Sequence, residues 1–413
     1  MNWDLILLFL FAILLGILIL LNKKKINVEK IAFPLIYILM YRTKLGLKQM
    51  DKLAKKFPKT ISVLAYFGII AGYASMILIF ALLTLKVFEF LFAGSPSPIA
   101  PLLPGIKTVP GVPVLGFWHW IISIFILAAV HEFSHGLVAR LHDVKLKSSG
   151  FAILSIILPI IPAAFVEPDE EQLKKRSNKQ QLGVLAAGSF SNYLTAAASL
   201  IIFLFVLVPL LSATITSTGV VVAGVQDGYP ASISGMKAGE QVISVNGEKV
   251  NNLDDFLNSL KDVKARDNVI VETNVSVYSI TTVKSPESFR DKIFFWREND
   301  KGYLGVVPIP VESDYKPGME ILGKSIAWVG LLFYWLFTIN LAVGMFNMLP
   351  LGPVDGGRMF LIAANYFIKD EKTAKRVWSF VSLFCFALIL AGLMPYIIKL
   401  FGFIFTPLIK IFF

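Results

Sequence analysis

Long apolar runs recur along the whole chain, and they constrain its fold more than any other feature. A helix of about 20 apolar residues can cross a bilayer, because it satisfies its backbone hydrogen bonds within itself. The runs that meet or approach this length are Leu5 to Leu21, Ile61 to about Phe92, the run from Phe117, Leu182 to Leu211, Ile321 to Leu349, and Val377 to Leu393. The sequence therefore predicts a polytopic α-helical membrane protein with about six or seven spans. Pro395 to Phe413 is the seventh candidate.

Composition and charge agree with this class. The chain has 413 residues, of which 56% are hydrophobic and only 16% charged. A net charge of +11 would suggest a nucleic-acid partner for a soluble protein. Here the basic residues lie in short loops beside apolar runs, so we predict a lipid bilayer and no nucleic acid as partner. The single cysteine, Cys385, excludes an internal disulfide and is expected to pack in the core.

The distribution of Lys and Arg predicts the orientation of the spans in the cell membrane. Residues 22–60, 141–181 and 358–376 are expected on the cytoplasmic side, and residues 93–116 and 218–312 outside. The first apolar run lacks a basic region before it and a small-residue cleavage site after it. We interpret it as a retained anchor and not as a signal peptide.

Two further apolar segments do not fit a complete span. Ile31 to Tyr41 is too short, and we place it at the membrane interface. Ser148 to Val166 is broken by Gly150, Pro159 and Pro162, so we predict a re-entrant hairpin buried in protein.

The motif with the clearest chemistry is His131-Glu132-x-x-His135, near the end of the third run. Residues four apart share one face of a helix, so the two imidazoles can bind one zinc ion. Glu132 lies about 100° round the same turn, where a carboxylate can reach a metal-bound water. Catalytic zinc takes three protein ligands and keeps one open position, so another segment has to supply the third ligand. Ionisable groups are costly within a span, which favours a functional role.

Two other segments hold polar residues within apolar surroundings. Gly188-x-x-x-Asn192, in the fourth run, is typical of close helix packing with an interhelical hydrogen bond. Asp355 follows a stretch whose prolines and glycines must break the fifth helix. Asp355 alone would be interpreted as the cap of the next helix, but beside an incomplete zinc site it fits the missing ligand. His119 and His142 are expected to be an interfacial residue and a loop residue.

The stretch from Thr218 to Glu312 has the character of a soluble domain. Asn246-Gly247 between β-branched runs predicts a β-hairpin, and Leu253 to Leu260 predicts a short helix. The order of elements resembles a PDZ domain of membrane proteases, closed by a strand at Gly302 to Val307. Glu240 stands where such domains usually carry Asp. The predicted fold is thus a helical membrane protein with an inserted α+β PDZ-like soluble domain.

These features divide the chain into five predicted segments. They are an N-terminal anchor with a basic cytoplasmic segment (1–60), a membrane catalytic half with the His-Glu motif (61–211), an extracytoplasmic PDZ-like domain (212–313), a second membrane catalytic half with the Asp-Gly motif (314–376), and C-terminal membrane segments (377–413).

Taken together, the two histidines with Glu132, Gly188-x-x-x-Asn192, the PDZ-like insert and Asn347-x-x-Pro350 with Asp355-Gly356 resemble the site-2 proteases. The stretch from Ala164 to Pro168 resembles the archaeal-type members. The resemblance implies intramembrane proteolysis of transmembrane-protein substrates, with the active site toward the cytoplasm. It implies one Zn²⁺ per chain on His131, His135 and Asp355, and Glu132 as general base. It also implies Asn192 and Asn347 as substrate-binding residues, which steady the substrate backbone or the active-site loop. The sequence carries no signal for the oligomeric state.

Two alternatives remain open at this point. One is a catalytically inactive membrane PDZ scaffold with a structural metal site, against which the intact Glu132 argues. The other is a zinc protease of a different family that cuts soluble or lipid-surface peptides. Many such enzymes take their third ligand from a downstream Glu or His, so the Asp355-Gly356 segment argues against it.

Overall fold

The computed structural model describes residues 3–22, 25–32, 36–107, 112–156, 158–286 and 300–412. The chain forms two compact units. Unit 1 consists of Met1–Leu204 together with Gly330–Phe413, and unit 2 consists of Phe205–Val329.

Six helical segments among the described residues are long and apolar enough to cross a membrane. They are α1 (Trp3–Leu21), α3 (Pro58–Ala93), α4 (Phe117–Leu141), the segment Asn178–Thr214, α11 (Glu320–Asn347), and Glu371–Lys399 of α13. The segment Asn178–Thr214 comprises α6 (Asn178–Ile202), a π-helical turn (Phe203–Leu207) and α7 (Val208–Thr214). Large apolar side chains stay exposed on these helices, as expected for surfaces that face lipid; Phe92, for example, is 79% exposed. The predicted multi-span helical membrane protein is confirmed at this level.

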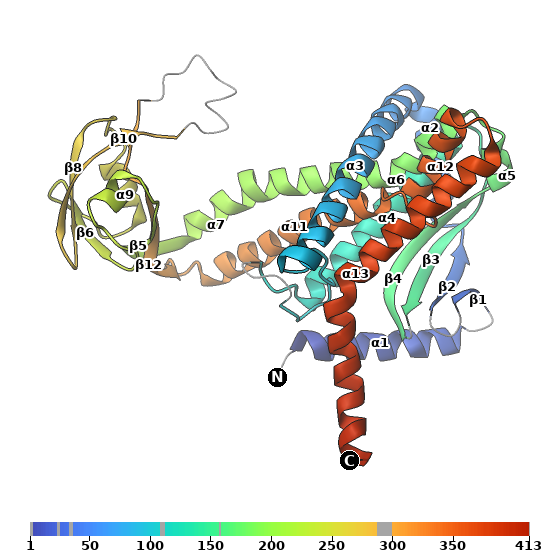
Figure 1. Ribbon diagram of the computed structural model, residues 1–413, viewed down its shortest axis with the longest axis horizontal. Coiled ribbons are helices and arrows are strands. Elements are labelled where there is room, and N and C mark those ends of the chain that lie inside the picture. The colour runs from blue at the N-terminus through green and yellow to red at the C-terminus, as the bar shows by residue number, and fades with distance from the viewer. Residues whose placement is uncertain are drawn as a thin grey trace. The chain divides into compact units, whose positions relative to one another are not determined.

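The C-terminal helix differs from the expected division at Pro395. α13 (Glu371–Phe412) is one continuous helix, where the sequence suggested a span ending at Leu393 and a separate segment after it. Proline lacks an N–H group and bends a helix without having to end it in a membrane protein. The α13 ribbon changes direction partway along its length (Figure 1).

Unit 1 contains an antiparallel sheet with the strand order β1-β2-β3-β4. The strands are β1 (Ile26–Ala32), β2 (Ile36–Thr43), β3 (Leu146–Ile156) and β4 (Leu158–Pro168). Ile31 to Tyr41, expected at the membrane interface, therefore lies mostly within two strands. The predicted re-entrant hairpin is a β-hairpin that pairs with β2. Strand pairing satisfies the backbone of these segments, which are too short or too rich in proline for a spanning helix.

β4 ends the strand order of this sheet, and its sequence suits such an edge. Pro159, Pro162 and Pro168 lack the N–H group that a central strand would donate, so proline is largely confined to edges. β4 packs against α4 and also contacts α1. The ribbons of β3 and β4 run beside α4 in Figure 1. This packing brings an edge strand to the helix that carries the His-Glu motif.

The helix packing of unit 1 joins α4 closely to α6, and α3 and α12 (Asp355–Phe367) pack on α6 as well. α6 begins with a capping box, in which Ser177 and Gln180 satisfy each other's backbone N–H groups. Buried residues at the α3, α4 and α6 contacts include Ala65, Val138 and Val184. The short helices α2 (Leu47–Lys56) and α5 (Glu170–Lys174) complete the described helices of the unit.

Unit 2 is built on a second antiparallel sheet with the order β12-β5-β6-β8-β9, and β7 pairs with β6. Its elements are β5 (Ile215–Val225), α8 (Pro230–Ile233), β6 (Gln241–Val245), β7 (Glu248–Lys249), α9 (Leu253–Ser259), β8 (Asn268–Thr273), β9 (Val277–Thr281), β10 (Val283–Lys284), β11 (Gly302–Tyr303) and β12 (Val306–Tyr315). Alternate valines of the strands form its core with Phe256 and Ile280. The predicted β-rich insert is confirmed, and α9 matches the expected short helix.

The predicted hairpin at Asn246-Gly247 is also confirmed. Both residues have positive φ, 52° for Asn246 and 83° for Gly247, and they connect the paired strands β6 and β7. A two-residue turn with positive φ at both positions matches the right-handed twist of the strands it joins. Asn and Gly are the residues that adopt this conformation with least strain.

Candidate metal centre

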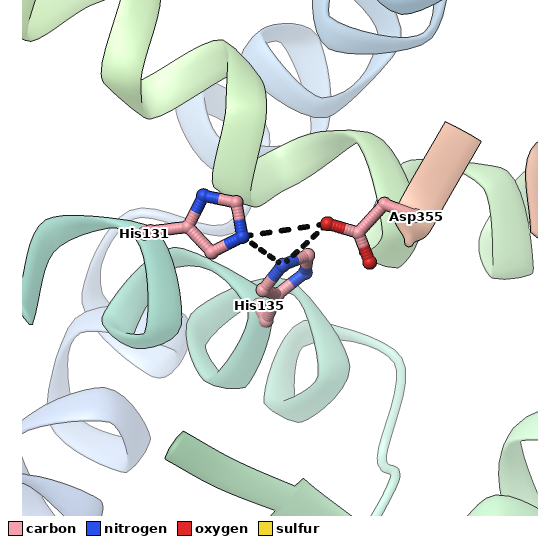
Figure 2. Close-up of side chains that lie close together, drawn as sticks. All are labelled: His131, His135 and Asp355. Atoms are coloured by element: carbon pink, nitrogen blue, oxygen red, sulfur yellow. Dashed lines mark hydrogen bonds and ion pairs between the residues drawn. The ribbon is translucent and has the colours of Figure 1, made fainter. Parts of the chain in front are cut away.

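Three side chains converge in unit 1, as Figure 2 shows: His131 and His135 from α4, and Asp355 from the start of α12. The two Nε2 atoms are 3.1 Å apart. Asp355 Oδ2 lies 3.4 Å from Nε2 of His131 and 3.2 Å from Nε2 of His135. Ligand atoms at zinc distances of about 2.0–2.1 Å in a tetrahedral site are about 3.3 Å from one another. The three donors therefore have the chemistry and the spacing of a zinc site.

Gly188 on α6 keeps the space beside these donors clear. A Cβ at Gly188 would lie 2.3 Å from Nε2 of His135 and 2.6 Å from Nε2 of His131. An ion bound by both nitrogens would have to occupy nearly the same position as this Cβ. The absence of a side chain at Gly188 therefore keeps open the space between the two imidazoles and α6.

The second ring nitrogen of each histidine, Nδ1, is hydrogen-bonded to a residue of α6. Nδ1 of His135 lies 2.7 Å from the carbonyl oxygen of Val184. A carbonyl only accepts, so this Nδ1 carries a proton, and in the neutral ring Nε2 keeps its lone pair. Nδ1 of His131 lies 3.1 Å from the side-chain amide of Asn192, which is completely buried. Metal-binding histidines typically have such partners on the second nitrogen.

Asp355 reaches the histidines because the chain before α12 is irregular and tightly packed. A Cβ at Gly356 would lie 2.3 Å from the carbonyl carbon of Met348, and one at Gly357 would lie 2.0 Å from the carbonyl oxygen of Leu351. Only glycine permits this approach. The N-cap of α12 is Val354 without a side-chain cap, so the alternative role of Asp355 as a helix cap is not observed.

α13 holds this loop in place from outside. The indole Nε1 of Trp378 donates to the carbonyl of Gly357 at 2.9 Å, and Ser382 donates to the carbonyl of Pro350 at 3.2 Å. Tyr73 of α3 donates to the carbonyl of Met359 at 3.1 Å. The first turn of α12 is therefore fixed by two neighbouring helices.

A cavity of about 370 Å³, here called the metal cavity, opens beside the three donors. Glu132 and Asn347 both line it. Oε2 of Glu132 accepts a hydrogen bond of 2.9 Å from the backbone N–H of Val166 on β4. Glu132 is outside the metal-ligand group found among the described residues, which comprises His131, His135 and Asp355.

The predicted site residues thus fall into two sets: those that line the metal cavity, and Asn192, which does not. The donors His131, His135 and Asp355 lie together, and Glu132 and Asn347 share the metal cavity with them. Asn192 lies behind His131 and is 0% exposed, so its position differs from that expected for a residue that contacts substrate.

Two contributions to the site were missed by sequence reasoning. The sequence indicates helix packing for Gly188 but not its position against the imidazoles. The contact of the Val184 backbone carbonyl with His135 has no signal in the sequence. The i, i+4 spacing of Val184 and Gly188 on α6 is the one feature that could have suggested both, because it places them on a common helix face.

A known protein family matches the part of the chain that carries these residues. The sequence profile of Peptidase family M50 matches residues 119–391, which include all three donors. The uncharacterized protein MJ0971 of Methanocaldococcus jannaschii is 29% identical over 318 residues, covering 76% of this chain and 74% of MJ0971. Protease RseP of Yersinia pestis is 24% identical over 210 residues, covering 39% of this chain and 45% of RseP. A Clostridium perfringens protein named "Putative zinc metalloprotease CPE1693" is 24% identical over 302 residues, covering 63% of this chain and 86% of that protein.

Proposed function

Because this chain belongs to peptidase family M50, the site-2 protease family, we propose that it is an intramembrane zinc metalloprotease. Its reaction is the hydrolysis of peptide bonds in or near the transmembrane segments of other membrane proteins, as in regulated intramembrane proteolysis. The observation that carries the proposal is the convergence of His131, His135 and Asp355 at the wall of a cavity that also contains Glu132.

The three donors hold one zinc ion per chain in this proposal. A bound zinc ion supplies a Lewis acid and makes water available as a nucleophile near neutral pH. Asp355 and the two Nε2 atoms are its protein ligands, and the metal cavity leaves room for water and substrate on the open side.

Glu132 is the general base. Its Oε2 is held by the N–H of Val166, which leaves Oε1 to accept a proton from the attacking water. The same carboxyl group then returns the proton to the leaving amine. A purely structural metal site needs no carboxylate in this position, which favours the protease over the inactive scaffold.

The two asparagines have different roles, because their exposure differs. Asn347 lines the metal cavity and is placed to hydrogen-bond a substrate backbone. Asn192 is completely buried against His131, so it orients the imidazole and does not contact the substrate.

The edge of β4 is the surface that binds the scissile segment in an extended form. The N–H of Val166 points away from β3 toward Glu132, and backbone direction alternates along a strand, so Ala164 also presents its N–H and C=O outward. An extended peptide can pair with such an edge. A substrate helix hides these backbone groups, so it has to unwind locally, and helix-weakening residues near the scissile bond favour cleavage.

Unit 2 selects substrates and performs no chemistry. It contains no histidine, and its sheet with α8 and α9 supports assignment as a PDZ-like domain over residues 212–313. We assign the flanking segments as an N-terminal anchor with a basic segment (1–60), two membrane catalytic halves (61–211 and 314–376) and C-terminal membrane segments (377–413). Replacing residues 218–312 with a flexible linker should leave zinc binding intact and relax selectivity against substrates with bulky external domains.

The charge distribution supports the orientation of the protein in the cell membrane. We place residues 22–60, 141–181 and 358–376 in the cytoplasm and residues 93–116 and 218–312 outside, so water reaches the metal cavity from the cytoplasmic side. Labelling of single cysteines in a Cys385→Ser background tests this placement. A cysteine in 218–312 that reacts only from the cytoplasm would contradict it.

The experiment that tests the function is cleavage of a tagged transmembrane peptide by the purified protein. We expect cleavage that stops with a zinc chelator and returns when zinc is restored. The Asp355→Ala protein should have lost both zinc and cleavage, because removing one of three ligands weakens the site severely. Full zinc content and full activity in that variant would place the third ligand elsewhere.

A further inference from the structure

A second cavity, of about 350 Å³, shares part of its wall with the metal cavity. We call it the apolar cavity. The residues common to both walls are Ala128, Glu132, Ala163, Ala164 and Val166. The rest of the wall comes from α1, α4, β3, β4 and residues 45–50. The proposed general base therefore borders two spaces of similar size.

The wall of the apolar cavity offers almost nothing to a polar ligand. Apart from Glu132 and Ser149, every residue that lines it is apolar. The hydroxyl of Ser149 already donates to the carbonyl of Leu45 at 2.6 Å, and Glu132 accepts from the backbone of Val166. Phe125 and Phe151 stack with ring centroids 6.2 Å apart and contribute aromatic surface. The ligand that matches this wall is an apolar group without hydrogen-bonding atoms.

The volume suits one large side chain. An apolar cavity of about 150 Å³ is enough to bind benzene. A space of about 350 Å³ therefore accepts a leucine or phenylalanine side chain with room for its attachment to a backbone.

We propose that the apolar cavity receives one apolar side chain of the substrate, from a residue next to the scissile bond. The inference rests on the proposed protease function and names a specificity pocket for it. A general base acts within about 3 Å of the water or group it deprotonates, so a wall that contains Glu132 is adjacent to the reacting carbonyl. Consecutive Cα atoms are about 3.8 Å apart, so the neighbouring residue lies within reach of this wall.

The occupant is a substrate side chain for two reasons. The residues of β4 that line both cavities include Ala164, whose outward backbone is the proposed docking edge. Transmembrane segments also consist largely of apolar side chains, so a substrate of the proposed class supplies this chemistry at nearly every position. A lipid acyl chain matches the wall but has no reason to be positioned by the catalytic carboxylate, and the experiment separates the two.

The test fills the apolar cavity from a position that lies outside the metal cavity. Ala129 on α4 lines only the apolar cavity and is exposed, so Ala129→Leu narrows it without a buried clash. Ala74→Leu is the matched control, since Ala74 is an alanine of α3 that is not buried and lines neither cavity. Zinc content and thermal unfolding are measured for both variants to establish that each is folded and loaded.

The substrates are transmembrane peptides whose scissile bond is first mapped by mass spectrometry. The residue on each side of that bond is then changed in turn between leucine and alanine, and kcat/KM is measured for each peptide. We expect the wild type and Ala74→Leu to prefer leucine by about tenfold or more at one of the two positions. Ala129→Leu should reduce this preference to about threefold or less.

Each remaining outcome overturns the inference in a distinguishable way. An unchanged leucine preference in Ala129→Leu, with both peptides cleaved as fast as by the wild type, shows that no substrate side chain enters the apolar cavity. An equal fall for the leucine and alanine peptides shows that the cavity serves another occupant, such as an acyl chain. If the zinc-loaded wild type cleaves none of the peptides, the proposed protease function itself is wrong.

Discussion

The carboxamide of Asn192 lies 3.1 Å from Nδ1 of His131, while Nε2 of the same ring faces Asp355. Its Oδ1 is buried and has no hydrogen-bond partner among the described residues. A metal at Nε2 requires the proton on Nδ1, and this N–H needs an acceptor. Turning the carboxamide about its last bond presents Oδ1 to Nδ1 and satisfies both groups. The metal-loaded protein should therefore hold Asn192 in the reversed orientation.

Substitutions at Asn192 test this relationship through zinc affinity. Asn192→Asp keeps an acceptor at Nδ1 and should retain zinc, whereas Asn192→Leu leaves the N–H unpaired and should weaken zinc binding about 10–100-fold. Competition with a chelating dye measures both affinities. If Asn192 instead donates its amide N–H, the Asp variant will be the weaker of the two, and the proposed orientation is wrong.

Gly188→Ala should abolish zinc binding while leaving the fold intact. The added Cβ would lie 2.3 Å from Nε2 of His135, in the space the metal requires. Alanine favours a helix over glycine by about 1 kcal/mol, and the atoms that must shift belong to the two imidazole side chains, so the helix packing itself is expected to persist. Gly183→Ala on the same helix is the control, since its Cβ would meet Ala65 at 3.5 Å, an ordinary contact. Equal zinc content in the two variants would contradict a metal position beside Gly188.

Glu132→Gln should separate catalysis from metal binding. The variant keeps the shape of the side chain and loses the proton acceptor, and positioned acid–base groups contribute about 10²–10⁴-fold to rate. We expect normal zinc content, cleavage reduced by about this factor, and a substrate that co-purifies uncleaved. All three are measured on one preparation. Normal cleavage by the zinc-loaded variant would rule out Glu132 as the base.

Ala164→Pro should impair cleavage without disrupting the sheet of unit 1. Ala164 is expected to point its N–H away from β3, so proline removes a donor to the substrate and no bond within the sheet. Ala163→Pro is the contrasting variant. The N–H of Ala163 is expected to point toward β3, so its loss should destabilise the sheet. Thermal unfolding and kcat/KM are compared for both. Unchanged cleavage by a folded Ala164→Pro protein would exclude docking at this position.

Unit 2 should lose stability in acid through Glu240. Burial alone would raise the pKa of this carboxyl group, but hydrogen bonds from Thr273, the backbone of Lys237 and Tyr278 hold the pKa below its usual 4.5. A pKa lower in the folded state stabilises the fold fully above about pH 4.5, and the contribution disappears as the pH falls through the folded-state pKa.

Glu240→Gln should therefore destabilise unit 2 by about 1–3 kcal/mol near neutral pH, and by less at about pH 4 and below. Unfolding of unit 2 is followed in the full-length protein with an Ala231→Cys reporter in a Cys385→Ser background. The reporter cysteine is buried in the folded state and reacts with a thiol reagent only after unfolding, so its reactivity gives the urea midpoint. The urea midpoints of the reporter protein with and without Glu240→Gln are compared at each pH, with a thiol reagent that still reacts in acid. A difference that does not shrink with falling pH would contradict the assignment.

The sequence by itself determined the features that depend on short-range periodicity. Apolar runs of sufficient length predicted the helices that can cross a membrane, and the i, i+4 spacing put His131 and His135 on one helix face. Asn246-Gly247 predicted its hairpin because two positive φ angles are a local requirement. In each case the residues that matter are neighbours in the chain, so the pattern carries the structural information directly.

Only the tertiary structure decided the features that join distant segments. The sheet of unit 1 pairs β2 with β3, which are separated in the chain by α2, α3 and α4. Its apolar, proline-containing strands are indistinguishable in sequence from broken membrane segments. The sequence connected Asp355 to the histidines only because their zinc site lacked a ligand and because of the family resemblance. Its actual position depends on glycines packed against the Met348 and Leu351 backbone. Gly188 and Asn192 both suggested helix packing, since a sequence does not show which helix faces the imidazoles. Their effect on a metal site arises from the close approach of α6 to α4, which depends on the packing of the whole unit.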